Sequence, residues 1–461
     1  MAKIRQLPKK ILCQEIDFST PHQRAEAHWD RFINSELGGI YQVIPWRDLC
    51  KLFRIKARET RGQKPEFDLQ GKIALQFLKA KSGLSDKDLM ERLSTDYSYQ
   101  FFCGVYYRPE DQVPGFKLIS DIRCELAQRL KVGDFQKVLA GAWKPYMKDT
   151  NIMLSDATCF ESYVRYPTDV KLLWECCEWT YGQMKRINKA IKGRMPRSKY
   201  SEIQQRYLHY QRNKKKTWKG TEKLIVSLLY LLNKLNKQLD SMEKFPGRDS
   251  LLKFRKYVER RRIVKKVYAQ QKKLHEKGER SPGMIVSIDK SYLRPIVRGK
   301  EIKRVEFGAK VNMIQVDGIN FMEHCSFNAF NEGSRLISSI GLHRDFFGKC
   351  THIAGDKIYA TNKNRTYCTK NNIITSFIPK GNVALEYEVQ TKKIKSILSR
   401  ERATRMEGSF GTEKNHYTLD KIKARIEGTE KLWIFFGIHT ANAALIAQRM
   451  AQARSNEKLA A

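Results

Sequence analysis

The sequence predicts an α/β protein in which helices flank a mixed sheet, with an amino-terminal helical domain and a basic helical insertion. Three observations predict it. Residues 305–356 read as strand, hairpin, strand, helix and strand, and an earlier strand leads to Asp156. The first 145 residues show helical spacing of apolar residues, and a later stretch combines a leucine stripe with dense positive charge. The predicted segments are a helical domain at 1–145, an insertion at 170–282, and a sheet domain formed by 146–169 and 283–461.

The charge balance points to a polyanionic partner. Lysine and arginine number 87 against 49 aspartate and glutamate, which gives a formal net charge of +38. A field of this sign attracts nucleic acid, so DNA or RNA is the first candidate partner. No apolar run reaches the roughly 18 residues that a membrane span requires, and no signal peptide opens the chain. We therefore expect no membrane association.

Length and composition exclude several other classes. A chain of 461 residues is too long for one ordinary core, so two or three domains are expected. Hydrophobic residues make up 41%, which excludes a disordered chain. The ten cysteines include no C-x-x-C pair, which argues against a zinc cluster. Free thiols favour a reducing compartment, so we expect the cytoplasm.

The amino-terminal region reads as short helices after a basic arm. Helices are expected over Ala25–Leu37, from Pro45 through Phe53, and over Ile119–Leu139. Residues 68–93 form two further helices around Gly83, with Ser85 capping the second. Such a pair could be a helix-turn-helix, but we favour a plain helical hairpin. A role in DNA-end binding or in dimerisation stays open.

Apolar residues lead to Asp156 in the stretch Asn151–Thr158, as expected for a strand with a carboxylate at its carboxyl end. A helix begins soon after Tyr166-Pro167, and Thr168 or Asp169 caps it. The insertion that follows is predicted to be a helical bundle or a helical hairpin, with an apolar stripe from Leu224 to Met242. Its lysine runs are either a solvated face or a nucleic-acid surface. Interleaved aromatic residues strengthen the nucleic-acid interpretation until the two are evenly balanced: Tyr207, Tyr210, Trp218 and Tyr257.

Strands return after Gly283. Met284–Ile288 is β-branched, and Val305–Val316 alternates in places before the turn dipeptide Asp317-Gly318 and a return strand through Ala329. A helix over Arg335–Leu342 precedes the strand that ends at Asp356. Gly355 lets the backbone approach a neighbour closely, and the basic run through Arg365 suits phosphate contacts. An aspartate at a strand end is often structural, so its role depends on its partners.

The stretch Arg400–Lys414 predicts a helix with Glu407, Gly411 and Lys414 on one face. Gly408 and Gly411 disfavour a helix, which is understandable where its backbone packs closely on a sheet or on a bound strand. The alternative is an exposed helix with ordinary ion pairs. Beyond it, Leu432–Ile438 and Ala441–Met450 predict a buried helix that closes the core.

Two strand-end carboxylates and one helical carboxylate form a set that suits hard divalent cations. Asp156, Asp356 and Glu407 could hold two metals about 4 Å apart and activate water or a hydroxyl against a phosphodiester. Oxygen ligands favour Mg²⁺, with Mn²⁺ as a substitute.

Several ordered blocks resemble bacterial insertion-sequence transposases of the DDE type. Ser155–Thr158 with Tyr166–Asp169 is similar to the family's first-Asp block, and Arg294–Lys300 with Val305–Lys310 to its next strand block. Ala354–Tyr359 resembles the second-Asp block, and Met406–Gly411 with Lys414 the final-Glu helix. The resemblance covers about 150–450 well, and more loosely the region from Phe67 to Cys103. Ala403 stands where some relatives carry an arginine.

The resemblance implies an RNase H-like catalytic domain in which Asp156, Asp356 and Glu407 are the metal ligands and catalytic residues. It implies metal-dependent cleavage at the element's terminal inverted repeats and strand transfer into target DNA. Because two ends must be joined at once, we expect a homo-oligomer, specifically a dimer. The residues predicted to contact DNA are Lys214, Lys215, Lys216, Arg298, Lys310, Arg365, Arg402, Arg405 and Lys414.

Two alternatives remain open at this stage. A metal-dependent DNA nuclease of the same fold would share the three carboxylates but would not transfer strands. A DNA-binding protein derived from a transposase would keep the basic surface and lose the metal site.

Overall fold

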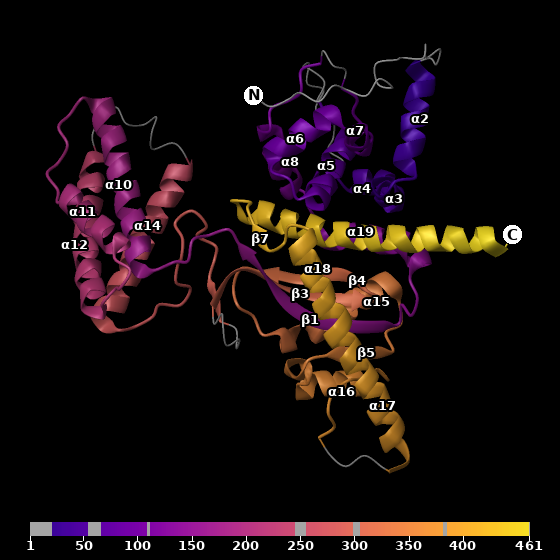
Figure 1. The fold of residues 1–461 in the computed structure, drawn as a ribbon. Coiled ribbons are helices and arrows are strands. Elements are labelled where there is room, and N and C mark those ends of the chain that lie inside the picture. The colour runs from indigo at the N-terminus through magenta and orange to yellow at the C-terminus, as the bar shows by residue number, and fades with distance from the viewer. Residues whose placement is uncertain are drawn as a thin grey trace.

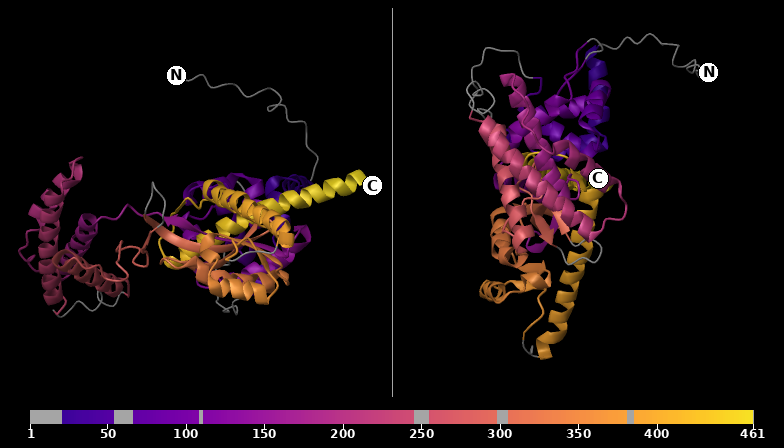
Figure 2. Two further views of the ribbon diagram at one scale, coloured as in Figure 1. Left: turned by 90° about the horizontal axis from the view of Figure 1, so that it is seen from below. Right: turned by 90° about the vertical axis from the view of Figure 1, so that its left-hand side faces the viewer.

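The computed structural model describes residues 21–53, 66–107, 111–244, 255–297, 305–380 and 385–460. A helical lobe stands beside a larger body, in which the amino-terminal helices lie on one side of a curled sheet (Figures 1 and 2). Helix α19 (Glu427–Ala460) lies between those helices and the sheet (Figure 1). It packs against α3, α5 and α8 on one side and against β4 on the other.

The amino-terminal helices are short, as the sequence predicts, but two boundaries differ. The expected helix Ala25–Leu37 is interrupted after Ile33, and Ser35 caps the second of the two helices that replace it. The expected helix Ile119–Leu139 is also divided into two helices. Ser85 caps α6 as predicted, and Gly83 has a φ of +66°. The helices are α2 (Pro21–Ile33), α3 (Glu36–Val43), α4 (Trp46–Leu52), α5 (Leu69–Ser82), α6 (Asp86–Thr95), α7 (Tyr97–Cys103), α8 (Lys117–Ala127) and α9 (Val132–Trp143), followed by η1 (Lys144–Tyr146).

Helix α5 is the central helix of this region. Every residue from Ile73 to Ala80 is buried, so the helix is covered on all sides rather than on one stripe. Phe77 meets Phe436 of α19 with ring centroids 4.9 Å apart. The amino-terminal helices and the sheet therefore share one hydrophobic core, with α19 between them.

The sheet has seven described strands in the order β2-β3-β1-β5-β6, with β4 also on β3 and β7 also on β1. The β1–β3 and β3–β4 pairs are antiparallel, whereas β1–β5 and β5–β6 are parallel. Both residues of the Asp317-Gly318 turn have positive φ, as a two-residue hairpin requires. The strands are β1 (Ile152–Ser162), β2 (Pro295–Val297), β3 (Val305–Val316), β4 (Ile319–Ser326), β5 (His352–Gly355), β6 (Ile374–Thr375) and β7 (Lys421–Ile422).

Strand β1 is longer than the sequence predicts. It continues to Ser162, so Asp156 lies in its middle rather than at its end. The reason is that β3 pairs with β1 as far as Glu161. On the other edge, however, β5 pairs only up to Ser155, and β7 resumes at Glu161. Asp156 is therefore the first residue of β1 beyond the end of its pairing with β5.

Helices cover both faces of the sheet. On β3, Asn312 bonds Ser339 of α15 (Leu336–Phe347), while Gln315 bonds Ser409 of α18 (Glu407–His416). Residues three apart on a strand point to opposite faces, so α15 and α18 lie on opposite sides. The remaining elements around the sheet are η2 (Glu332–Arg335), η3 (Lys357–Tyr359), α16 (Asn362–Lys370), α17 (Leu385–Glu401) and the π-helix η4 (Arg402–Met406).

The insertion is a helical bundle with a hydrophobic core of its own. The predicted strand Met284–Ile288 is wrong, because this segment is not a strand and Ile285 and Ile288 pack into the bundle core. Thr168 caps the first helix, as predicted. The helices are α10 (Asp169–Ile191), α11 (Tyr200–Arg212), α12 (Trp218–Met242) and α14 (Arg255–Lys277).

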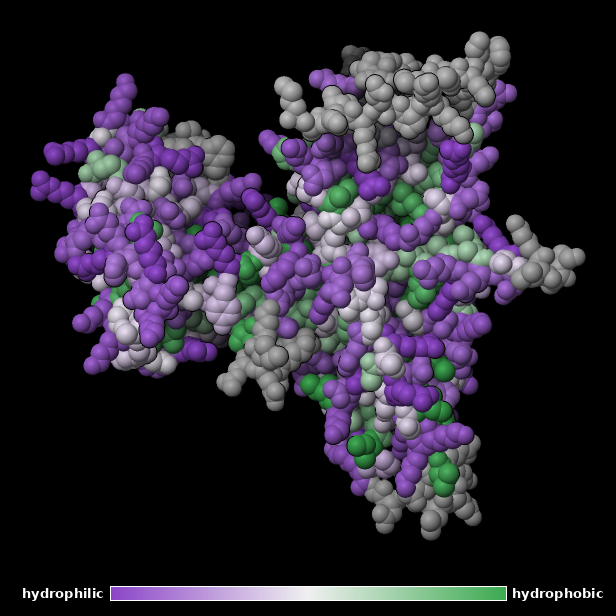
Figure 3. All heavy atoms as spheres, viewed as in Figure 1, coloured by the Kyte–Doolittle hydropathy of each residue, from purple (hydrophilic) through white to green (hydrophobic). Residues whose placement is uncertain are grey.

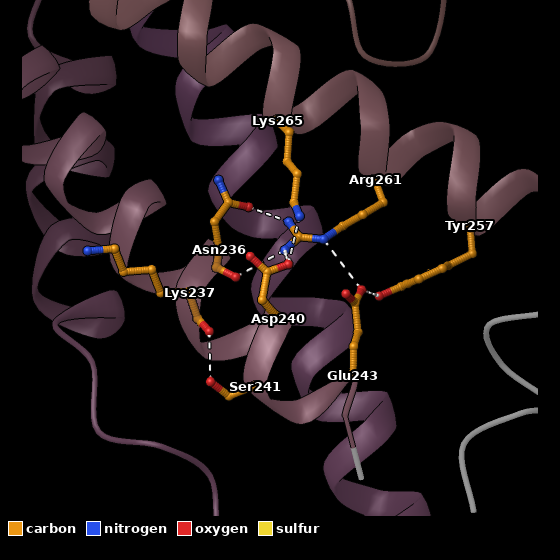
Figure 4. A network of polar contacts seen from close by, with 8 residues as sticks. All are labelled: Asn236, Lys237, Asp240, Ser241, Glu243, Tyr257, Arg261 and Lys265. Atoms are coloured by element: carbon orange, nitrogen blue, oxygen red, sulfur yellow. Dashed lines mark hydrogen bonds and ion pairs between the residues drawn. The ribbon is translucent and has the colours of Figure 1, made fainter. Parts of the chain in front are cut away.

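A buried guanidinium joins α12 to α14. Arg261 of α14 bonds the side chain and the carbonyl oxygen of Asn236, and pairs with Asp240 at 2.7 Å and Glu243 at 3.4 Å (Figure 4). Burial disfavours the ionised form of Asp240, but Lys265 and Arg261 lower its pKa below the ordinary value. The network pairs the buried charge with two carboxylates, which favours a single register for the two helices.

Candidate active site and nucleic-acid surface

Asp156 and Asp356 are brought together by strand register. Ser155 of β1 lies opposite Gly355 of β5, so the two aspartates follow at the same level of a parallel pair. Gly355 is needed there because the Tyr359 ring covers it, and a Cβ would lie 3.2 Å from that ring. Asp356 is exposed and accepts a hydrogen bond from the Lys357 N–H at 2.6 Å. The two aspartates are thus neighbours where β5 ends, although only Asp356 directly follows the end of its strand as predicted.

Asp156 is paired with a cation from the helix above it. The Arg402 Nη1 atom is 2.6 Å from Asp156 Oδ2, and the Ala157 N–H donates to the other oxygen at 2.8 Å. Burial raises the pKa of Asp156, and Arg402 opposes that shift. The charges of Glu332 and Asp356 raise the pKa further, which indicates that these two carboxylates lie close to Asp156.

Glu332 and Tyr359 are neighbours of the site that the sequence pattern did not reveal. Glu332 pairs with Lys310 at 2.6 Å, and both side chains are largely buried. The Tyr359 hydroxyl donates to Asn312 Oδ1 at 2.6 Å, and burial raises the pKa of this phenol well above its ordinary value. Glu332 follows Asn331 at a helix start, where an acidic residue usually stabilises the helix dipole. The sequence therefore contains no signal that distinguishes this structural role from a role in the site.

Glu407 occupies the first turn of α18, directly after the π-helix. Its side chain is exposed and makes no hydrogen bond or ion pair within the described ranges. The expectation that Gly408 and Gly411 pack closely on the sheet is wrong, since a Cβ at either position would meet no neighbouring element within 4 Å. Close approach of a bound strand stays a prediction. The helix face around Glu407 is therefore open.

Across residues 21–460, wherever the structure describes them, no three His, Cys, Asp or Glu side chains are grouped closely enough to hold a metal ion. Asp156 and Asp356 lie side by side, and Glu407 lies on the helix that crosses the same face. Side chains alternate along a strand, so Asp156 and Thr158 point to the face that α18 covers. Arg402 pairs with Asp156, and the Lys414 Nζ atom lies 3.1 Å from Thr158 Oγ1. Glu407 lies between these two basic residues along the helix.

The other residues predicted to contact DNA near the sheet have different settings. Arg405 is half exposed and pairs with Glu401 at 2.6 Å. Lys310 is buried against Glu332, and the Arg365 Nε atom donates to the Ala360 carbonyl oxygen at 3.0 Å. Arg298 lies outside the described residues. Lys310 thus has the surroundings of a structural residue, whereas Arg405 is exposed but pairs with Glu401 and, at 3.6 Å, with Asp317.

The insertion carries an exposed basic surface. Lys214, Lys215 and Lys216 lie in the loop between α11 and α12, and all three are exposed. Figure 3 shows hydrophilic residues over most of this lobe. The interleaved aromatic residues are mainly structural, because Tyr207 is buried and stacks on Trp174, and Tyr257 bonds Glu243. Of the four aromatic residues in the pattern, Trp218 alone is exposed, at 75%.

A comparison with protein families matches residues 28–125 to a model described as "Transposase domain (DUF772)". This match supports a transposase family. It spans about a fifth of the chain and covers nearly all of the region from α2 to α8. Comparisons with curated proteins and with solved structures each gave no match. Among the described helices, none is both long and apolar enough to span a membrane.

The transposase-domain match and the sheet site come from different parts of the chain. The matched helices pack through α19 on the sheet that carries Asp156 and Asp356. A transposase family suggests DNA as the partner, and the excess of basic residues is consistent with it.

Proposed function

We propose that the chain is a DDE transposase that cleaves DNA at the ends of its element and transfers the freed 3′-hydroxyl to target DNA. The observation that carries the proposal is the adjacency of Asp156 and Asp356 on the parallel β1–β5 pair, beneath the helix that bears Glu407. The transposase-domain match supports the same family from a separate segment.

The strand arrangement supports an RNase H-like sheet. The path β4-β3-β1-β5-β6 begins with three antiparallel strands and ends with two parallel ones, and helices cover both faces. Aspartates where two parallel strands separate are well placed to act on a ligand at that edge.

Asp156, Asp356 and Glu407 would hold the divalent metals, Mg²⁺ or Mn²⁺. All three are carboxylates, the donors that these ions prefer, and the Arg402 guanidinium already places a positive charge against Asp156. Bound metals would polarise the scissile phosphate and lower the pKa of the attacking water or hydroxyl. The chain's own part is to hold two carboxylates at fixed register, to supply Glu407 from an open helix face, and to present Lys414 and Arg405 to the DNA.

The basic loop of the insertion, Lys214–Lys216, would hold element or target DNA through its phosphates. The recognised ends would be the terminal inverted repeats of the element. A homodimer would bring two ends together, and the protein would act in the bacterial cytoplasm at the nucleoid.

The first test compares single carboxylate variants with a matched surface variant. We expect Asp156→Asn, Asp356→Asn and Glu407→Gln each to reduce Mg²⁺-dependent DNA cleavage by more than about 100-fold, because metal-ion catalysis supplies several kcal/mol. The control is Asp345→Asn, since Asp345 is half exposed and pairs with Lys137 on the surface. Full cleavage by Asp356→Asn would refute the assignment.

The same preparation separates the alternatives. A pre-cleaved end with a 3′-hydroxyl would be joined to target DNA by a transposase and left unjoined by a nuclease. A DNA-binding protein without catalysis would show neither reaction in wild-type form while still binding the DNA.

A further inference from the structure

A broad groove lies between the amino-terminal helices and the sheet. Its volume is about 980 Å³, and its walls come from α5, α6 and α8 on one side and from residues 414–433 on the other. These elements lie on the side of the body that faces the insertion, where Figure 1 shows β7 and the first turns of α19 below α6 and α8. One wall belongs to the matched transposase domain and the other to the sheet domain.

The groove is strongly basic. Its lining holds seven lysine or arginine side chains and only two aspartates. Asp86 is compensated, with Lys79 at 2.9 Å and Arg123 at 3.3 Å. Burial alone would favour the neutral acid, but these two cations lower the pKa of Asp86, so it adds no free acceptor for a further cation.

Three basic side chains of the lining are available to a ligand. Lys87, Lys423 and Arg425 are exposed, and none of them pairs with an acid among the residues that the structure describes. They come from α6 and from the segment between β7 and α19, so both walls contribute. Unpaired cations that converge from two walls favour an extended anionic ligand over a single small anion.

The groove leads to the strand that carries Asp156. Lys414 lines the groove and contacts Thr158, two residues further along β1 and on the same face as Asp156. Lys421 also lines it and pairs with Glu161 of β1 at 2.6 Å. A polyanion lying in the groove would thus pass beside the part of β1 that follows Asp156.

We propose that this groove binds the sugar-phosphate backbone of the DNA that extends from the cleavage site, with Lys87, Lys423 and Arg425 contacting phosphates. The inference rests on the proposed function, since it takes the edge at Asp156 as the place of cleavage. It assigns a DNA path that crosses from the transposase-domain helices to the sheet. DNA in this path would lie on the side of the body that faces the insertion.

The test measures DNA binding without catalysis. Fluorescence anisotropy with a labelled duplex, in chelator and over a range of salt concentrations, is applied to the full chain and to the triple variant Lys87→Gln, Lys423→Gln, Arg425→Gln. We expect an affinity loss of about 10- to 100-fold and a salt slope that is shallower by about 0.9 for each phosphate no longer neutralised. The matched control triple is Lys144→Gln, Lys148→Gln, Lys349→Gln, whose exposed side chains precede β1 and β5 at the opposite end of the sheet.

The outcomes are distinct. An unchanged affinity and slope in the groove triple, or equal losses in the two triples, would overturn the proposal. So would a groove triple that binds DNA normally but no longer binds labelled polyglutamate, because the groove would then serve an acidic protein. Circular dichroism checks that all variants are folded. Because DNA binding is measured in the presence of a chelator, it does not depend on the metal site. The groove proposal and the carboxylate assignment can therefore fail independently of each other.

Discussion

At the scale of single residues, Glu413 is a buried carboxyl group with an incomplete set of hydrogen bonds. It lies on α18 and is 1% exposed. One oxygen accepts a hydrogen bond from Asn320 Nδ2 at 2.6 Å, and the other has no partner. Burial raises its pKa to about 8, against the opposing effects of Asn320 and Lys414. Glu413 is therefore protonated in the folded chain at neutral pH.

This pKa predicts how stability depends on pH. The unfolded chain ionises Glu413 near 4.5, while the folded chain keeps it neutral until about 8. Its contribution to stability is complete below the lower value and is lost as the pH rises toward the upper one. Glu413→Gln should thus raise the free energy of unfolding at about pH 9 by an amount on the order of 4 kcal/mol, and change it little at about pH 4. Denaturant titrations at the two pH values measure this difference.

A pH-independent effect of Glu413→Gln would contradict the neutral state of the folded side chain. Ser409→Ala on the same helix face is a control, because it removes bonds to Gln315 and Asn320 without removing a titratable group. Its effect should be the same at both pH values.

The carboxylate pair shows what a single sequence can and cannot predict at this scale. The apolar runs before Asp156 and Asp356 predict strands, because a strand has a local pattern that can be read from a few residues. The two aspartates are thereby identified as residues on strands, and these strands are neighbours in the sheet. Arg402 lies 246 residues from Asp156, and no local pattern encodes that interaction. The proximity of Glu332 to Asp156 is likewise a long-range contact that no local pattern predicts.

At the scale of elements, the best and the worst predictions have clear causes. Strand β3 was placed at its observed bounds because the Asp317-Gly318 dipeptide fixes its end. Met284–Ile288 has the composition of a strand, but it packs on the core of the insertion instead. Strands and irregular segments can both bury apolar side chains, so apolar composition alone does not distinguish a strand from an irregular segment. The long β1 follows from pairing with β3, which is a non-local effect.

The separate core of the insertion predicts local rather than global destabilisation. Leu232 of α12 is fully buried in that core, and Leu→Ala changes of this kind cost about 2–5 kcal/mol. We expect Leu232→Ala to increase hydrogen exchange in α10 and α12 while α19 keeps its protection. Val226→Ala on the same helix is the control, since Val226 is 59% exposed. Equal loss of protection in α19 would show that the two cores unfold together.

At the scale of the whole molecule, positive charge is spread over both lobes, and the net value of +38 makes salt-sensitive DNA binding the main expectation. The insertion contributes an exposed loop, and the body contributes the groove beside β1. These surfaces can be tested separately because they belong to different cores.

Neutralising the insertion loop should weaken DNA binding without affecting the fold. The triple Lys214→Gln, Lys215→Gln, Lys216→Gln removes three exposed charges, and the salt slope should become shallower by up to about 0.9 for each phosphate that the loop neutralises. Anisotropy titrations over a range of salt concentrations measure it, with the Lys144, Lys148 and Lys349 triple as control. A fall in affinity with an unchanged slope would argue against phosphate binding by this loop.

The position of α19 has a consequence for how the chain is made. The amino-terminal helices bury their apolar surface against a helix that the ribosome synthesises after every other described element. The Phe77 ring, for example, cannot pack on Phe436 until that helix has been made. Until α19 emerges, a nascent chain exposes the surface that this helix will cover, and such surface attracts chaperones and proteases. Premature termination before α19 should therefore yield degraded or aggregated chains rather than partly active ones, whichever lobe binds the DNA.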